Sequence, residues 1–464
     1  MRIKAARLLP LLVFGLGGCA QLPGYERPQA PIAADWPASA AAEPGAQMHI
    51  PGDWRKAYPD PRLQALIETA LLHNRDLRLA TARIEEARAL LGLAGADLRP
   101  GVDATASAAS QRADGDTSRR FQAGVQMPAF ELDLWGRVRS RDEAALQRFF
   151  ASEEAARAVR LTLIADVAET YLLKLELGER LRLTEATLAS REQTREIVAR
   201  RRDVGLAGDL DLLQAEAALN LARADRAALH RQLAAADNAL TLLLGTTPSH
   251  LPPGRDLDAQ DLVADLAPGL PAEVLLRRPD VLAAEARLKA ANADIGAARA
   301  AFFPTVTLTA ALGLASRGLT DLFDAASGTW LFQPAMRLPL FDAGRTRAGV
   351  DLAEARKLAA VAEYERAIQQ AFREVADGLA ARGSLAEQLA ALQGQERIQT
   401  ERLRLAEARY RAGLTSYLEV LDAQRDLYTA GQAVVQTRRA LLANTVRLYR
   451  TLGGGWPRTP LSGG

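Results

Sequence analysis

The chain has 464 residues, with 58 lysines and arginines against 56 aspartates and glutamates, and it contains a single cysteine. This near-balance of charge, without a basic arm, argues against a nucleic-acid partner, and one cysteine excludes an internal disulfide bond. After Leu16 no apolar run approaches the roughly 20 residues that a membrane-spanning helix needs. We therefore expect any membrane crossing to use β-strands.

Residues 1–18 are predicted to be a cleaved secretory signal, because a basic start is followed by a short apolar run that ends at Leu16. The sequence Leu16-Gly17-Gly18-Cys19 resembles the bacterial lipobox, whose cysteine is acylated and becomes the mature N-terminus. The alternative is a secreted protein with a cysteine at this point by chance. No Asp follows Cys19, and the resemblance then implies sorting to the outer membrane. Residues 19–61, rich in Pro and Ala, are predicted to be a tether or a wrapping segment without a core of its own.

The rest of the chain repeats itself at an offset of 208 residues. Gly136-Arg137 returns as Gly344-Arg345, and Gly205-Leu206 returns as Gly413-Leu414. A repeat this long indicates a duplicated half-molecule rather than a solenoid of short units. The predicted organisation is a first repeat over residues 62–250, a linker over 251–270, a second repeat over 271–453 and a tail over 454–464.

Each half is predicted to contain a helix, two strands, a very long helix, a glycine turn and a further helix. The long helices lack proline, and their apolar residues recur at alternating three- and four-residue steps. In the first half the expected ranges are a helix over 62–97, strands within 101–134 around a turn at 114–116, and helices over 137–203 and 209–244. In the second half they are a helix over 271–303, strands over 304–315 and 329–341, and helices over 345–411 and 417–452.

The predicted strands alternate with a period of two. Apolar residues stand at even positions from Val306 to Leu314, and Thr305, Thr307 and Thr309 stand between them. About ten alternating residues per strand are typical of a membrane barrel, although one such hairpin alone is more often an ordinary surface hairpin. Two hairpins at equivalent positions of the repeat favour the barrel. The alternation defines two faces without saying which one meets lipid.

The helix lengths predict four long columns per chain. A 67-residue helix is about 100 Å long and each 36-residue helix about 54 Å, so two short helices end to end match one long helix. Four strands cannot close a barrel, and open sheet edges are not tolerated in lipid. A dimer would supply eight strands, whose lumen side chains fill, and a trimer twelve, which leaves a bore. The sequence therefore predicts a mainly α-helical chain that forms a membrane β-barrel as a trimer.

Several strings of residues resemble the outer-membrane efflux protein family, the TolC-like channels, and in particular its lipoprotein branch. They are the lipobox, Arg277-Arg278-Pro279-Asp280, the run from Pro339 to Gly344, the run from Arg409 to Gly413 and the run from Tyr417 to Arg425. The resemblance covers essentially the whole mature chain. It implies a homotrimer with a 12-stranded outer-membrane barrel and a 12-helix periplasmic tunnel. It also implies a periplasmic adaptor and an inner-membrane pump, of RND type, as partners in the export of drugs, metals or other small toxic molecules.

In that family the tunnel narrows near the turn after the long helix, and the resemblance places a gate at matching positions here. These are Leu418, Glu419, Asp422 and Arg425, with Tyr410 joining the latch. Leu418 and Asp422 are four residues apart, and Asp422 and Arg425 three apart, so they share one helical face. Three copies of a carboxylate around an axis would make a ring that prefers cations. The alternative is a solvated helix end with ordinary ion pairs.

Other conspicuous residues are given structural roles. Asp209 and Asp211 are expected to be N-cap and first-turn acids of a helix, and Glu196 and Arg200 to form an i,i+4 pair. Trp135 and Trp330 suit either a membrane-interface belt or core packing. The four histidines show no metal-ligand spacing, and no nucleophile, phosphate-loop or dinucleotide motif is present. We expect neither an enzyme nor a cofactor.

Two other function classes are alternatives to a channel. A lipid-anchored periplasmic coiled-coil spacer without a pore would explain the helices and Cys19, but not the paired alternating hairpins. A periplasmic adaptor would need a lipoyl-like β-domain, for which the sequence leaves no room. Conductance of liposomes would separate a channel from a spacer.

Overall fold

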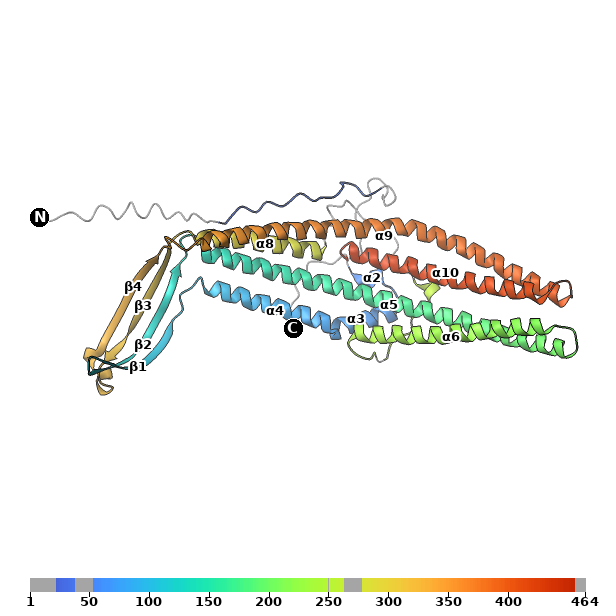
Figure 1. The fold of residues 1–464 in the computed structure, drawn as a ribbon, viewed down its shortest axis with the longest axis horizontal. Helices are drawn as coiled ribbons and strands as arrows, with labels where there is room; N and C mark the ends of the chain where they lie inside the picture. Colours follow the sequence, from blue (N-terminus) through green and yellow to red (C-terminus); the bar gives the residue numbers. More distant parts are fainter. Residues whose placement is uncertain (1–21, 38–52, 249, 263–277, 455–464) are drawn as a thin grey trace. The chain divides into compact units, whose positions relative to one another are not determined.

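The computed structural model describes residues 22–37, 53–248, 250–262 and 278–454. Cys19, Arg277 and residues 263–270 of the predicted inter-repeat linker lie outside these residues. The chain forms two compact units: unit 1 comprises Met1–Ala30, Ala82–Ala155 and Asp280–Ala367, and unit 2 comprises Pro31–Thr81, Ala156–Pro279 and Ile368–Gly464. Helices α5 (Arg137–Asp203) and α9 (Arg345–Arg411) each run through both units without a break (Figure 1). Their 67 residues each confirm the predicted ranges.

Unit 1 contains one antiparallel sheet of four strands. The strands are β1 (Asp103–Ala113), β2 (Asp116–Leu132), β3 (Thr305–Ser316) and β4 (Gly328–Arg337), and they lie in the order β1-β2-β3-β4. Asp114 and Gly115 join β1 to β2 with φ angles of 54° and 88°, and such positive angles are typical of a tight two-residue hairpin turn. The short 3₁₀ turns η3 (Thr320–Phe323) and η4 (Ala325–Ser327) join β3 to β4. Within the described chain, β1 and β4 each have one free edge.

The predicted end of the last strand is wrong. The sequence indicated strand structure as far as residue 341, but β4 ends at Arg337. Pro339 has no backbone N–H with which to continue the ladder, so pairing stops just before it. Pro334 is accepted within β4 because this strand lies at the sheet edge.

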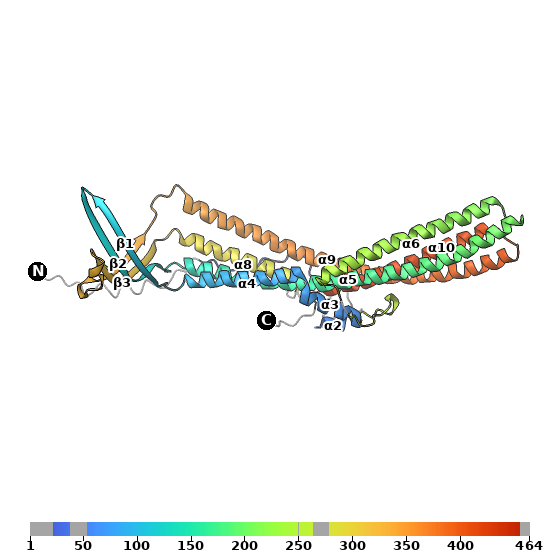
Figure 2. The same cartoon turned by 90° about the horizontal axis from the view of Figure 1, so that it is seen from below.

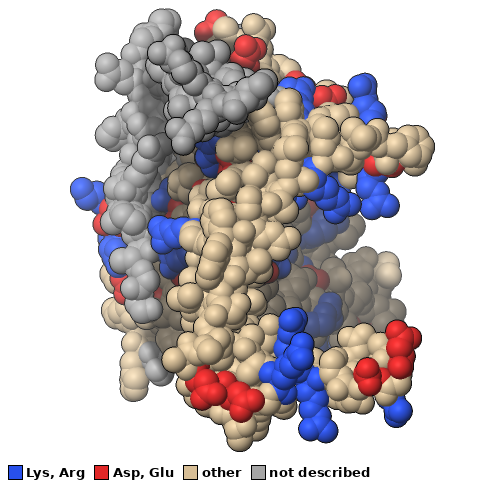
Figure 3. All heavy atoms as spheres, turned by 90° about the vertical axis from the view of Figure 1, so that its left-hand side faces the viewer, with Lys and Arg blue, Asp and Glu red and all other residues tan. Residues whose placement is uncertain are grey.

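The register of the sheet separates an apolar face from a polar one. Leu312 lies opposite Trp330, and Val306 lies opposite Met336, and directly opposite residues project to the same side of a sheet. Leu312, Trp330 and Met336 are 66%, 75% and 72% exposed. Thr305, Thr307 and Thr309 occupy the other face by alternation. In the space-filling view uncharged residues cover most of the strand surface (Figure 3).

Residues 22–30, here called the N-terminal segment of unit 1, lie along helix α8 (Pro279–Ala300). The Arg27 guanidinium donates to both carboxylate oxygens of Glu285, with its Nη2 at 2.9 Å from each. Asn292 donates to the carbonyl of Pro23 at 2.8 Å. Helix α8 confirms the helix predicted over 271–303 from residue 279 to residue 300. The first eight positions of the predicted range, 271–278, do not belong to a described helix.

Unit 2 has its own hydrophobic core, and the end of the predicted tether is part of it. A short helix, α2 (Trp54–Ala57), precedes α3 (Pro61–His73). Trp54 and Tyr58 are only 2% and 1% exposed, and they join a cluster with residues of α5 and α10. Residues 54–58 of the predicted tether or wrapping segment thus pack into the core of unit 2 and form no core of their own. An aromatic pair in a Pro- and Ala-rich stretch was the signal for this contact.

The helix predicted over residues 62–97 is in fact two helices, α3 and α4 (Arg75–Ala96). They are separated by Asn74, whose extended backbone ends α3 and whose side-chain oxygen accepts from the N–H of Leu77 at 2.9 Å. Its amide donates to the carbonyl of Leu243 at 2.8 Å, close to the end of α6 (Asp209–Leu244). Helix α6 thus ends against the start of α4, as the predicted stacking of short helices requires.

The second half of the chain uses the same arrangement. Helix α10 (Tyr417–Thr451) ends beside Arg278, which donates to the carbonyl of Thr451 at 3.1 Å. Along unit 2, α6 lies beside α5 and α10 beside α9 in both ribbon views (Figure 2). Of the helices in the described ranges, none is both long and apolar enough to cross a membrane.

A buried carboxylate joins three segments of unit 2. Asp60 is completely buried and accepts from the backbone N–H groups of Arg62 and Arg255 at 2.8 and 3.1 Å. It also accepts from the Tyr171 hydroxyl at 2.9 Å and from the Gln260 amide at 2.7 Å. Burial alone would raise the pKa of Asp60, but these hydrogen bonds outweigh it and hold the pKa below the ordinary aspartate value.

Candidate functional site

The two helical turns of unit 2 have the same backbone geometry. After α5, the N–H of Leu206 donates to the carbonyl of Arg201 at 2.7 Å, and after α9 the N–H of Leu414 donates to that of Arg409 at 2.9 Å. Gly205 and Gly413 have φ angles of 75° and 73°, which a residue with a β-carbon adopts only with strain. This glycine-terminated helix end explains why the Gly-Leu pair recurs at the repeat offset.

A small apolar cluster fixes the α9–α10 turn against α5 and α6. Its buried members include Val198, Leu212, Tyr417 and Val420. The rings of Tyr410 and Tyr417 lie 5.5 Å apart, and the Arg201 guanidinium lies 4.9 Å from the Tyr410 ring centre. Burial is the main cause that raises the pKa of Tyr417, to about 12. The predicted latch residue Tyr410 is thus held by packing and a cation–π contact.

The predicted charged gate residues lie on the first three turns of α10. Glu419 pairs with Arg409 across the turn, with 3.5 Å between its Oε1 and the Arg409 Nη1, and it accepts from the Thr415 hydroxyl. Asp422 pairs with Arg425 at 3.1 Å, as their spacing predicted. The structure therefore brings Tyr410, Glu419, Asp422 and Arg425 to one end of unit 2.

Sequence reasoning missed two further charged residues at this site. Arg425 also contacts Asp426 at 3.2 Å, and Asp426 receives the Arg402 guanidinium at 2.6 Å. That hydrogen bond from Arg402 is the main reason why the pKa of Asp426 is lowered. Asp426 could have been found, since it lies four residues after Asp422 on the same helical face. Arg402 lies on α9, and no local spacing points to it.

The predicted steric plug, Leu418, is 49% exposed. Leu414 in the preceding turn is 71% exposed, so two large apolar side chains reach solvent near the charged pairs. Exposed leucines cost hydration free energy unless another surface covers them. Their exposure in a single chain is consistent with burial against neighbouring copies.

The residues given structural roles behave as follows. The N-cap of α6 is Gly208, and Asp209 and Asp211 lie in the first turn as predicted. The N–H of Gly208 donates to Asp211 at 3.2 Å. Arg200 and Glu196 form the expected pair at 3.6 Å. Trp135 stacks on Phe303 with 4.8 Å between ring centres and donates to the carbonyl of Pro304 at 2.8 Å. This side chain packs within unit 1, whereas Trp330 is exposed on the strand surface.

A comparison with protein families identifies the chain. Residues 66–246 and 270–454 match the model of the family described as outer membrane efflux protein. The chain belongs to this family. The two matched segments correspond to the two halves of the repeat, and the match decides between the channel and the spacer that the sequence left open. This member of the family is located in the outer membrane.

Named relatives and solved structures agree with this assignment. The chain is 43% identical to a probable efflux pump outer membrane protein, TtgC, of Pseudomonas putida, over 98% of this chain and 96% of the relative. It is 44% identical to the outer membrane protein OprJ of Pseudomonas aeruginosa, over 96% and 95% of the two chains. The MtrE outer membrane channel of Neisseria gonorrhoeae, solved in its open state, superimposes with a TM-score of 0.88 at 38% identity, over 95% of this chain and 99% of that chain.

These comparisons confirm the predicted fold class, a mainly helical chain with a four-stranded antiparallel sheet and an internal repeat. They also confirm the predicted family and its channel function. No group of three or more metal-ligating side chains occurs in the described ranges. The family and the relatives named above are described as efflux or outer membrane proteins, and none of these descriptions includes an enzymatic activity.

Proposed function

We propose that this protein forms a homotrimeric channel that carries small toxic molecules out through the outer membrane. A periplasmic adaptor and an inner-membrane pump of the RND type supply the molecules and the energy. The channel itself is passive. Relatives named for the efflux of toluene and antibiotics support small organic compounds as the transported class.

The four-stranded sheet with two free edges carries this proposal. One face of the sheet is apolar and exposed, and a lipid-facing barrel surface has this character. Free edges at β1 and β4 must be paired within a membrane, and β4 of one copy can pair with β1 of the next. Three copies supply twelve strands, enough for an aqueous bore.

Conductance across a planar lipid bilayer tests the channel function. Purified protein should give discrete, stable current steps in a membrane without pump or adaptor. A protein that binds to the membrane without conducting under any applied voltage, including after the gate substitutions described below, would contradict the proposal.

Assembly should stop at three chains. We expect chemical cross-linking in mild detergent, and native mass spectrometry, to give a trimer as the largest species. The reason is that three sheets close the barrel and leave no edge for a fourth. A species that ends at the dimer, or a monomer that keeps its β-structure, would overturn the closure argument.

The gate proposal assigns the steric block to Leu418 and the latch to Glu419, Asp422, Arg425 and Tyr410. Replacing both Asp422 and Arg425 by alanine should raise conductance and weaken cation preference, since a carboxylate ring and its ion pairs are lost. Exposed pairs are individually weak, so the effect comes from three copies that share one axis.

Asp351 and Arg347 provide a matched control for the gate variant. They form an exposed pair at 3.2 Å near the start of α9, and their replacement by alanine removes the same two charges at the end of α9 opposite to the proposed gate. Conductance should then stay at the wild-type value. Equal conductance in both double variants, with trimers intact, would place the gate elsewhere.

Lipidation at Cys19 completes the proposal. Mass spectrometry of the mature protein should show an N-terminal cysteine with attached acyl chains, and an unmodified N-terminus at or beyond Ala20 would exclude the anchor. The Cys19→Ala variant should still fold and insert, because the apolar sheet face supplies a hydrophobic belt of its own.

A further inference from the structure

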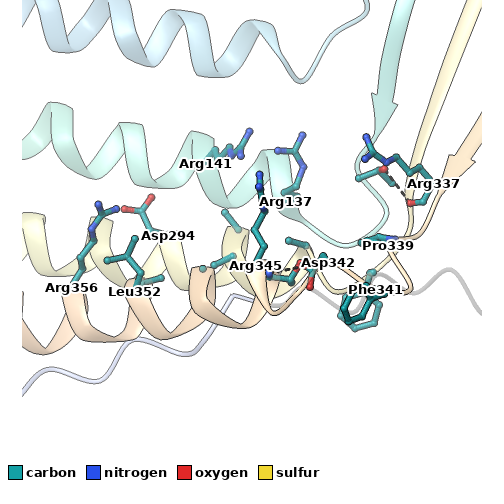
Figure 4. A pocket seen from close by; sticks show the side chains of 18 of the residues that line it. Arg137, Arg141, Asp294, Arg337, Pro339, Phe341, Asp342, Arg345, Leu352 and Arg356 are labelled. Atoms are coloured by element: carbon teal, nitrogen blue, oxygen red, sulfur yellow. Dashed lines mark hydrogen bonds between the residues drawn. The ribbon is translucent and has the colours of Figure 1, made fainter.

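An arginine-rich cavity of about 940 Å³ lies in unit 1 at the base of the sheet (Figure 4). It is lined by residues from the starts of α5 and α9, the end of α8 and the end of β4. Its charged lining consists of Arg137, Arg141, Arg148, Arg337, Arg345 and Arg356, with only two carboxylates, Asp294 and Asp342. None of these charged residues belongs to the candidate gate on α9 and α10.

Both cavity carboxylates are already occupied. Asp294 pairs with Arg148 at 2.5 Å. Asp342 accepts from the backbone N–H groups of Gly344 and Thr346 at 3.0 and 2.8 Å and so caps the first turn of α9. Two carboxylates facing six arginines leave a net positive charge in the lining.

Four of the cavity arginines lack a hydrogen-bond or ion-pair partner for their side chains among the described residues. Arg137 pairs with Glu131, but the side chains of Arg141, Arg337, Arg345 and Arg356 make no hydrogen bond or ion pair within the described residues. In the close view Arg345 extends from α9 toward Arg137 on α5, and Arg141 lies one turn further along α5. Arg141 feels repulsion from Arg137 and attraction from Glu131, Asp97 and Asp294. Guanidinium groups that converge repel one another, and an anion bound between them relieves that repulsion.

Two observations place the cavity on the lumen side of unit 1. First, the N-terminal segment contacts α8 through Glu285 and Asn292, whereas Asp294 lies about 200° further around the helix than Asn292. The segment continues from the proposed lipid anchor at Cys19, so its side of α8 is the outside of the channel, and the cavity opens on the other side.

The second observation comes from the sheet. Arg337 lies directly opposite Thr305 and therefore shares the polar face with Thr307 and Thr309. The polar face of an outer-membrane barrel faces the lumen. The N-terminal segment and the strand register thus agree, and both place the arginines inside the channel.

We propose that this cavity is an anion-binding site in the channel lumen, which takes phosphate- or carboxylate-bearing solutes. The proposal rests on the trimeric channel proposed above and adds a chemical class to what passes through it. Planar guanidinium groups bind such oxyanions through paired hydrogen bonds. Three copies around the axis would make a belt that concentrates anions where the barrel meets the helices.

Inorganic pyrophosphate is a suitable probe, and its binding to the full-length trimer in neutral detergent can be measured by calorimetry at low ionic strength. We expect the Arg141→Gln/Arg345→Gln variant to bind pyrophosphate about tenfold more weakly or worse, because two charge-assisted contacts are lost. The matched control is Arg139→Gln/Arg347→Gln, which removes two arginines of the same helices that lie outside the cavity and pair with Asp133 and Asp351.

Equal pyrophosphate binding by wild type and both variants would overturn the proposal, as would an equal loss in both variants. If the double variant does not assemble, the single Arg141→Gln variant carries the same test, since its side chain makes no hydrogen bond or ion pair within the described residues. A repeat of the titration in bilayer discs of neutral or anionic lipid distinguishes the sources of the ligand. Competition by anionic headgroups would mean that the cavity faces lipid, which also overturns the proposal.

The outcome is separable from that of the channel proposal. Calorimetry reports on the cavity whether or not the protein conducts, and wild-type conductance does not require pyrophosphate. Conducting trimers that fail to bind pyrophosphate would refute the anion site alone.

Discussion

Replacing Leu312 by arginine is expected to prevent most of the protein from inserting into the outer membrane. Leu312 lies in the middle of β3, is 66% exposed and faces the same side as Trp330. An arginine on the lipid face of a barrel costs about 2–4 kcal/mol near the middle of the bilayer. Each trimer carries the substitution three times, so the total cost approaches the stability of a typical domain.

The measurement is the fraction of protein recovered as trimer from the outer membrane. Ala311→Arg is the matched control, because the adjacent residue projects to the polar face and places the same charge in water. Ala311→Arg should insert at close to the wild-type level. Normal insertion of Leu312→Arg, or a greater loss from Ala311→Arg, would reverse the assignment of the two faces.

Replacing Asp60 by alanine should destabilise unit 2 by about 3 kcal/mol. Four donors point at this buried carboxylate, and removing it leaves them without partners in the protein interior. The thermal unfolding midpoint of the detergent-solubilised protein should fall accordingly. Asp258→Ala, an exposed aspartate in the nearby turn η2 (Leu257–Ala259), should change the free energy of unfolding by no more than about 0.5 kcal/mol.

The same residue predicts a dependence on pH. The folded-state pKa of Asp60 lies below its unfolded value, so between the two values the unfolded chain binds more protons. The stabilising contribution is therefore fully present above the unfolded pKa of about 3.9 and is lost as the pH falls through the lower folded value. The Asp60→Asn variant lacks this group, and its stability should depend less on pH in that acidic range. An identical acid profile in the two proteins would show that Asp60 does not contribute.

The long helices could be predicted from sequence because their signal is local and extended. Proline-free periodic stretches gave α5, α6 and α9 with their observed ends, and the recurrent Gly-Leu pairs gave both turns. The break at Asn74 could not be predicted in this way, since it depends on a contact with Leu243, far away in the chain. The predicted end of β4, residue 341, lies four residues beyond the observed end at Arg337. The alternating pattern continues past Pro339, but the missing N–H of this proline stops the pairing.

In the candidate gate, too, contacts along one helix could be predicted from sequence, and contacts between helices could not. The Asp422–Arg425 pair follows from spacing along one helix, and the structure contains it. The pair between Arg402 and Asp426 joins two helices, so it requires the packing of α9 against α10. The arginine cavity was not predicted at all, because its residues come from three helices and a strand that meet only in the folded unit.

The duplication has a consequence for any partner that meets the helix tips. At the repeat offset of 208 residues, Asp422, Arg425 and Asp426 correspond to Gln214, Ala217 and Ala218, and Tyr410 corresponds to Arg202. The backbone turns are nearly equivalent, but the pairs of Arg425 with Asp422 and Asp426 occur only in the α9–α10 hairpin, whereas the α5–α6 hairpin pairs Arg195 with Glu216. A proposed trimer would therefore present six hairpins of alike shape and two alternating chemistries. A ring of six identical partner subunits would have to bind both kinds of hairpin, although the two differ in side-chain chemistry. A set of three partner subunits could bind one kind of hairpin alone.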